Sequence, residues 1–90
     1  MTDAAAPTME RIRQRLQAKF SPSVLEVLDE GAKHIGHAGE GKGHFHVLIV
    51  SVAFAGATPI QRHHMVYAAL DDLMDHGIHA LAIDARAAAP

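Results

Sequence analysis

The sequence predicts an α+β domain in which a three-stranded mixed sheet has helices packed on one face. Three observations lead to this prediction. A helical apolar pattern opens the chain, two β-rich segments flank a glycine-rich loop, and a second helical pattern precedes a last β-rich segment. Strands joined by one loop most simply pair antiparallel, whereas strands joined through a helix are normally parallel with a right-handed crossover. The order helix–strand–strand–helix–strand therefore gives one sheet with both kinds of pairing.

The first helix is expected over residues 8–19. Its apolar positions recur with a spacing near 3.6 residues and form one stripe toward the core. The stripe consists of Met9, Ile12, Leu16 and Phe20. Glu10 in the first turn and Lys19 in the last turn suit the helix dipole. The helix is expected to stop at Ser21, because a residue that precedes proline avoids the α region.

Two strands are expected next, on either side of a loop. Residues 23–31 are rich in valine and leucine between a proline and a glycine, which is typical of a strand. Residues 32–43 are rich in glycine and form the loop. Residues 44–52 form the second strand. The side chains of Phe45 and Val47 point to one face of the sheet and those of the neighbouring residues point to the other face. These two strands are expected to pair antiparallel.

A second helix is expected from Pro59 to Asp75, after a turn at residues 54–58. Its apolar stripe is predicted to contain Ile60, His63, Val66 or Tyr67, Leu70, Leu73 and Met74. Gly77 is a suitable residue to end the helix, and residues 78–85 have the pattern of the third strand. Because a helix separates the second and third strands, these two strands are expected to be parallel.

The chain is short and nearly neutral. Its 90 residues suit one domain, which we place at residues 8–86 between disordered tails at 1–7 and 87–90. A formal net charge of −2 gives no general attraction to nucleic acid. No apolar run approaches the roughly 20 residues that cross a bilayer, and the first residues lack the blocks of a secretion signal. We therefore expect a cytoplasmic protein with no membrane partner.

Histidine is the most informative residue type, because the chain contains eight histidines and no cysteine. Neutral imidazole is a common ligand of zinc, copper and iron. The parallel pairing places His79, at the start of the third strand, near the glycine-rich loop, where His34 or His37 could meet it. Two imidazoles complete neither a zinc site nor a two-iron cluster, so the missing ligands, thiolates included, would come from a partner. The alternative is that most histidines are ordinary surface or packing residues.

Other motifs in the sequence are weaker. Residues 36–43 match most of a phosphate-binding P-loop, but glycine replaces the magnesium-binding hydroxyl residue and a strand follows instead of a helix. The sequence contains neither a nucleophile-elbow spacing nor a distinctive carboxylate pair, so no motif indicates an enzyme. A basic stripe in the first helix consists of Arg11, Arg15 and Lys19, with Arg13 beside it. Such a stripe is most simply a solvated helix face.

Six segments, taken in order, resemble those of a known family. They are Pro22–Glu30, His34, Gly43–Ser51, Phe54–Gly56, Arg62–Leu70 and Ile78–Ile83. Their order and spacing together are highly specific, and over about residues 9–86 the sequence resembles the BolA family. The resemblance implies an α-β-β-α-α-β domain similar to the type II KH fold, with a short extra helical turn before the long helix.

The resemblance also implies a function. BolA-like proteins bind monothiol glutaredoxins and share a [2Fe-2S] cluster with the glutaredoxin cysteine and glutathione. The implied histidine ligands are His79, in the Ile-His-Ala-Leu motif, and a loop histidine, which we expect to be His34 with His37 in reserve. We therefore expect a non-enzymatic adaptor in iron–sulfur trafficking or iron regulation.

Some members of the family are described as transcriptional regulators, which gives an alternative function. Contact with DNA or a partner would then use the helix-turn-helix-like segment, with Arg62, His63, His64 and Lys42. The family's usual Arg-His-Arg ends here in His64, which removes a permanent positive charge from this surface. The near-neutral chain also counts against strong phosphate binding. A third hypothesis is a small binding module whose histidines are incidental.

Overall fold

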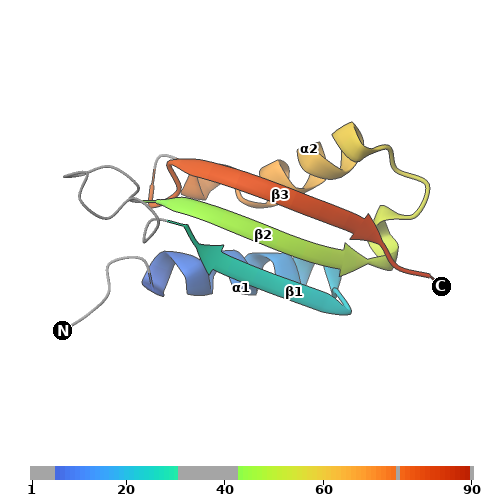
Figure 1. Cartoon of the computed structure of the whole chain (residues 1–90), viewed down its shortest axis with the longest axis horizontal. Helices are drawn as coiled ribbons and strands as arrows, with labels where there is room; N and C mark the ends of the chain where they lie inside the picture. The colour runs from blue at the N-terminus through green and yellow to red at the C-terminus, as the bar shows by residue number, and fades with distance from the viewer. Residues whose placement is uncertain (1–5, 31–42, 75, 90) are drawn as a thin grey trace.

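The computed structural model describes residues 6–30, 43–74 and 76–89. A three-stranded sheet forms one layer, and both helices lie on the same face of it (Figure 1). The elements in chain order are α1 (Ala6–Phe20), β1 (Val24–Asp29), β2 (His44–Ser51), the 3-10 turn η2 (Val52–Phe54), α2 (Pro59–Ala69), the 3-10 turn η3 (Asp71–Leu73) and β3 (Ala80–Ala87). The predicted α+β class, with helices on one face of a mixed sheet, is confirmed.

The central strand of the sheet is β2. It pairs antiparallel with β1 and parallel with β3, so both predicted pairings are confirmed. The parallel register places His44 of β2 opposite Ala80 of β3. Phe45, Val47 and Ile49 are buried against the helices, while the residues between them are half-buried on the other face. The predicted alternation along β2 is therefore correct.

The apolar stripe of α1 is also the predicted one. Ile12 and Leu16 are fully buried and Phe20 is nearly so. The helix begins two residues earlier than expected, at a residue that we assigned to the N-terminal tail. Directly after the helix, Ser21 has a positive φ of 43°. The chain thus leaves the helix through the left-handed region just before the proline.

The second helix begins as predicted but ends early. Its N-terminus is a capping box, in which the Thr58 hydroxyl accepts a hydrogen bond from the Gln61 N–H and the Gln61 side chain accepts one from the Thr58 N–H. The helix runs only from Pro59 to Ala69. The prediction of a helix that continues to Asp75 is therefore wrong.

The early end of α2 has an electrostatic reason. Asp71 and Asp72 would lie at the negative C-terminal end of a longer helix, where their charges are unfavourable. In the structure they lie instead in the first turn of η3. The Asp72 carboxylate also forms an ion pair with Arg15 of α1, which joins the end of the α2 region to the first helix.

The predicted apolar stripe of the second helix is only partly correct. Val66, Leu70 and Leu73 are buried as expected, the last of them through η3. Ile60 is 70% exposed and His63 is also exposed, so their predicted core positions are wrong. The residue one full turn before Val66 is Arg62, which is half-buried, and this rotation of the helix turns His63 toward solvent.

The η2 turn occupies the place of the extra helical turn that the family resemblance implies. Ser51, which is almost fully buried, supports it. Its hydroxyl donates to the Phe20 carbonyl at 2.6 Å and accepts from the Ala53 N–H at 3.0 Å. The last strand starts and ends two residues later than expected, so it includes Ala87, which we assigned to the C-terminal tail.

The core lies between the sheet and the two helices. Its buried apolar residues are Ile12, Leu16, Phe20, Val27, Phe45, Val47, Ile49, Phe54, Val66, Leu70, Leu73 and Ile78. No helix of the described chain covers the other face of the sheet, which faces the viewer in Figure 1. Side chains on that face are therefore half-buried, such as that of His44, or exposed, such as that of Leu28.

The ion pair between α1 and η3 predicts a pH dependence of stability. Arg15 donates to both carboxylate oxygens of Asp72, and this hydrogen bonding lowers the pKa of Asp72 from 3.8 to about 2. Because the folded-state pKa is the lower one, the stabilisation is complete above about pH 4 and is lost as the pH falls toward 2. We expect the difference in unfolding free energy between the wild type and Asp72→Asn to shrink over that range, measured by urea unfolding.

The control for this prediction is Asp71→Asn, which removes the same charge from the neighbouring residue. Asp71 has no ion pair to any residue that the structure describes. A pH-independent difference for Asp72→Asn, or an equal pH dependence for Asp71→Asn, would contradict the assignment to the Arg15 pair.

Candidate functional site

The first candidate site is the end of the sheet where β2 and β3 begin, and His79 lies there. The N–H groups of His79 and Ala80 both donate to the carbonyl of Gly43, at 2.8 and 3.1 Å. The backbone of His79 is thereby fixed directly before β3, while its side chain is exposed. This arrangement presents an imidazole to solvent from a rigid position.

The structure places a second histidine beside His79. The rings of His44 and His79 have centroids 5.8 Å apart and are parallel to within 9°. The parallel register explains the proximity, because His44 is the residue opposite Ala80. The sequence alone predicts no role for His44. Alternation along the strand indicates the face on which His44 lies, but only the register shows that it meets His79.

Two glycines shape the backbone around this histidine pair. Gly43 has a φ of +73°, and a Cβ atom there would lie 2.7 Å from the Gly77 carbonyl oxygen and 3.0 Å from the His79 nitrogen. Gly77 has a φ of +121°, and a Cβ atom there would lie 2.6 Å from the Thr8 hydroxyl. The close approach of these backbones requires glycine at position 43, because the atoms in the way belong to the main chain.

A shallow hollow adjoins the histidine pair on the uncovered face of the sheet. Its volume is about 300 Å³, and it is lined by Glu30, His44, Phe45, Ala80, Leu81 and Ala82. The Glu30 carboxylate lies 3.7 Å from Nδ1 of His46, the next residue on the same face of β2 as His44. A carboxylate in this hollow makes its electrostatic potential more favourable for a cation.

His34, His37 and Lys42 lie outside the described residues. Within residues 6–30, 43–74 and 76–89, no group of three or more histidine, aspartate or glutamate side chains is arranged to hold a metal ion. The part of the site that the structure shows is therefore the pair of His44 and His79.

The predicted DNA or partner contact residues divide into two kinds. Arg62 is half-buried, and its guanidinium donates to the Ala57 carbonyl at 3.0 Å and to the Ala85 carbonyl at 3.3 Å. The bond to Ala85 connects α2 to β3, so Arg62 has a structural role that the sequence did not reveal. His63 and His64 are exposed on α2 and remain accessible to a partner.

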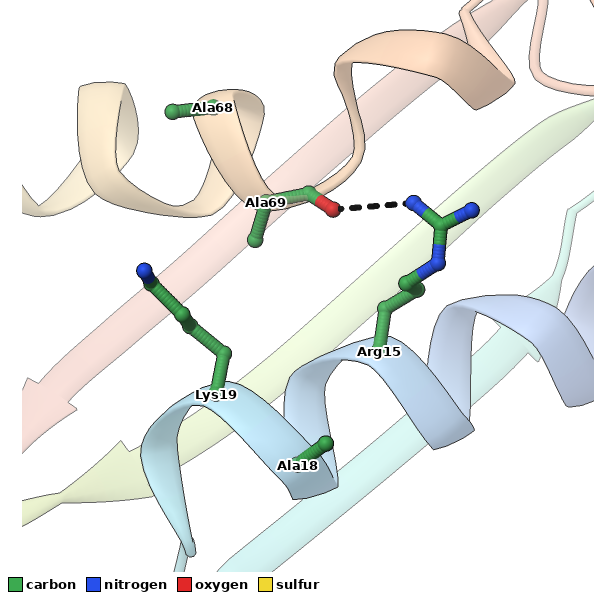
Figure 2. A pocket seen from close by; sticks show the side chains of 5 residues that line it. All are labelled: Arg15, Ala18, Lys19, Ala68 and Ala69. Carbon is green, nitrogen blue, oxygen red and sulfur yellow. Dashed lines mark hydrogen bonds between the residues drawn. The ribbon is translucent and has the colours of Figure 1, made fainter.

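The second candidate site is a groove between α1 and α2 (Figure 2). Its volume is about 420 Å³, and its lining consists of Arg15, Ala18, Lys19, Ala68 and Ala69. An Arg15 N–H donates to the Ala69 carbonyl at 3.4 Å, beside the ion pair with Asp72. The lining therefore combines two basic side chains of α1 with small apolar side chains from both helices (Figure 2).

The basic stripe of α1 is partly neutralised. Arg13 pairs with Glu10 and Arg15 pairs with Asp72. Arg11 and the groove residue Lys19 form no ion pair with any described residue. Two unpaired cations on an exposed helix agree with the expected solvated face. Separately, no helix in the described part of the chain is long and apolar enough to cross a membrane.

Comparison with known proteins identifies relatives of the whole domain. The family model for "BolA-like protein" matches residues 16–89. The chain is 42% identical to mouse BolA-like protein 1 over 83 residues, which cover 92% of this chain and 60% of the mouse protein. It is also 42% identical over 74 residues to the Escherichia coli K12 protein named DNA-binding transcriptional regulator BolA, covering 82% of this chain and 70% of that protein.

A solved structure shows the same fold. The BolA domain of SufE1 from Arabidopsis thaliana superposes with a TM-score of 0.79 at 40% sequence identity, covering 89% of this chain and 91% of that domain. The chain spans only about 60% of the length of the mouse protein. The similarity therefore concerns the domain and not the whole of each relative.

Proposed function

This chain belongs to the BolA family, and from that premise we propose that it is a non-enzymatic adaptor in cytoplasmic iron–sulfur trafficking or iron regulation. In this proposal it binds a monothiol glutaredoxin and shares a [2Fe-2S] cluster with it. The observation that carries the proposal is the exposed imidazole of His79 on a backbone held by the Gly43 carbonyl. A ligand fixed in this way requires little reordering when a partner approaches.

The donor set of the chain fits one half of such a cluster. A two-iron cluster takes four protein or thiol ligands, and histidine can replace cysteine on one of the two irons. The chain has no cysteine, so it offers imidazoles only. His79 and the loop histidine, His34 or in reserve His37, would supply these two ligands, while the glutaredoxin cysteine and glutathione would supply the thiolates. The bound cluster would add electron-transfer and iron–sulfur donor chemistry to the complex.

The proposal predicts that His79→Ala abolishes most of the shared cluster. The wild type or variant is co-purified anaerobically with a monothiol glutaredoxin and glutathione, and the visible absorption and circular dichroism of the complex are recorded. We expect the variant to lose the wild-type spectrum, because the exposed ligand is removed while the buried core is unchanged. His76→Ala is the control, since His76 is also exposed and lies three residues earlier. A wild-type cluster spectrum and iron content for His79→Ala would refute the ligand assignment.

The alternative is a DNA-binding regulator, which the name of the Escherichia coli relative and the exposure of His63 and His64 favour. Two observations count against it. The Arg62 guanidinium donates its hydrogen bonds to two backbone carbonyls, and the net charge of the chain is −2. Duplex DNA titrated across a salt series separates the two functions. Affinity that falls steeply with salt, and that weakens in His63→Ala and His64→Ala, supports the regulator. An absent salt slope excludes it.

A further inference from the structure

The ring pair at the start of β2 and β3 supports a role that needs no partner. We propose that His44 and His79 together form a two-imidazole site for one divalent ion of the zinc or copper type, which the isolated chain takes up. The proposal rests on the proximity of the two rings, whose centroids are 5.8 Å apart. It is independent of glutaredoxin, glutathione and the shared cluster.

The separation of the rings suits a common ion. Because a zinc–imidazole nitrogen bond is about 2.0–2.1 Å long, two imidazoles on one ion hold their ring centres roughly 5 to 6.5 Å apart. The observed 5.8 Å lies inside this interval. In the parallel arrangement the in-plane lone pairs of the two rings do not meet at one point. Metal binding therefore requires rotation about the side-chain torsions of His44 and His79, while the sheet keeps the two residues next to each other.

Both ligands are carried by rigid parts of the fold. His44 is the first residue of the central strand, and it lies opposite Ala80 in the parallel ladder. His79 is fixed by the two hydrogen bonds to the Gly43 carbonyl. A pair that is already in place loses less conformational entropy on binding than two histidines on a mobile segment. The sheet itself thus holds the two rings near each other.

The surroundings also favour a cation over an anion. Glu30 lines the same hollow as His44, so a carboxylate lies next to the proposed ion. His79 is exposed and His44 is half-buried, which leaves the remaining coordination positions open to water. Neutral imidazoles suit Zn²⁺ and Cu²⁺, and Cu²⁺ is expected to bind more tightly than Zn²⁺. A site with two protein ligands and water is weaker than a structural zinc site, which has four.

The test is a titration of the isolated full-length chain, monitored by calorimetry with ZnCl₂ or CuCl₂ and by the ¹⁵N shifts of the imidazole nitrogens with ZnCl₂, which is diamagnetic. The variants are His44→Phe and His79→Phe, which keep a planar ring but remove the ligand nitrogens. His46→Phe is the matched control, because His46 lies on the same strand and face but has its Nδ1 directed at Glu30. Thermal unfolding without metal checks that each variant is folded.

We expect one equivalent of ion to bind the wild type, with imidazole shifts confined to His44 and His79. Each of His44→Phe and His79→Phe should weaken binding about tenfold or more, because loss of a ligand costs at least as much as loss of an outer-shell partner, whereas His46→Phe should bind as the wild type does. Unchanged affinity in both ligand variants overturns the proposal. Loss of uptake only in the double variant His34→Ala/His37→Ala overturns it as well. No uptake by the folded wild type also overturns it. None of these outcomes bears on the shared cluster, because the titration contains no glutaredoxin.

Discussion

Gly43→Ala is expected to destabilise the domain by about 2–4 kcal/mol, through backbone strain and a clash with the main chain. Position 43 has a φ of +73°, which an L-residue with a Cβ atom adopts at a cost. The added Cβ would also lie 2.7 Å from the Gly77 carbonyl oxygen and 3.0 Å from the His79 nitrogen. Because both atoms belong to the backbone, relief of the clash requires β2 and the start of β3 to separate.

The same substitution is expected to impair ligand binding at the His79 site by more than the loss of stability alone would explain. The Gly43 carbonyl holds the His79 and Ala80 N–H groups, so a shift at position 43 displaces His79 directly. We expect a folded fraction of Gly43→Ala to retain little of the shared cluster and of the two-imidazole metal uptake. The measurements are urea unfolding for stability, and cluster absorption and zinc titration for the site.

Gly56→Ala is the matched control for this prediction. Gly56 has almost the same φ, +78°, but a Cβ atom there would have no neighbour within 4 Å. Its substitution should therefore cost only the conformational strain, about 1–2 kcal/mol, and leave His79 in place. Equal destabilisation by the two variants would show that Gly43 is needed for its φ alone and not for the close approach of the backbones.

The sequence was sufficient to predict the α+β class and the strand pairings, because these depend on local patterns. The spacing of Ile12, Leu16 and Phe20 and the alternation along β2 each follow from which side chains must be buried. The end of α2 was missed because an apolar pattern continues through Leu73, while the two aspartates after Leu70 favour a new turn. That choice depends on the charge at a helix terminus and on the Arg15 partner from α1, which no local pattern contains.

The candidate site was only half predictable, for a related reason. His79 could be placed near the end of the sheet, because parallel pairing is a consequence of strand and helix order. The proximity of His44 depends on the exact pairing of His44 with Ala80, and a shift of one residue would turn its side chain to the other face. Arg62 was expected on a contact surface, but its bond to Ala85 exists only after α2 has packed against β3.

Phe54→Ala is expected to lower stability by about 3–5 kcal/mol, the usual cost of removing a fully buried phenylalanine ring. Phe54 is 0% exposed, and its ring centroid lies 5.0 Å from that of Phe20 at the C-terminal end of α1. The ring thus closes the core at the end of the sheet where β2 finishes. For a domain of this size each kcal/mol corresponds to roughly 4–8 °C in Tm, so the variant is expected to unfold roughly 12–40 °C below the wild type.

Phe54→Leu keeps the prediction measurable if the alanine variant does not fold, because leucine fills part of the cavity and its cost is expected to be smaller. Val52→Ala is the control from the same turn, since Val52 is 57% exposed and its truncation should change stability by less than about 0.5 kcal/mol. Calorimetric or urea unfolding gives the three values. A loss below about 1 kcal/mol for Phe54→Ala would show that the ring does not support the core.

The position of Phe54 also allows a test of whether a loss of core stability affects the histidine site. β2 and β3 are parallel, so Phe54 follows the end of β2 while His44 and His79 lie where the two strands begin. Folded Phe54→Leu is therefore expected to bind zinc and to share a cluster as the wild type does, in spite of its lower Tm. Gly43→Ala should lose both activities at a similar or smaller stability cost, because it moves the backbone that carries His79. The two variants together separate loss of the site from loss of the fold.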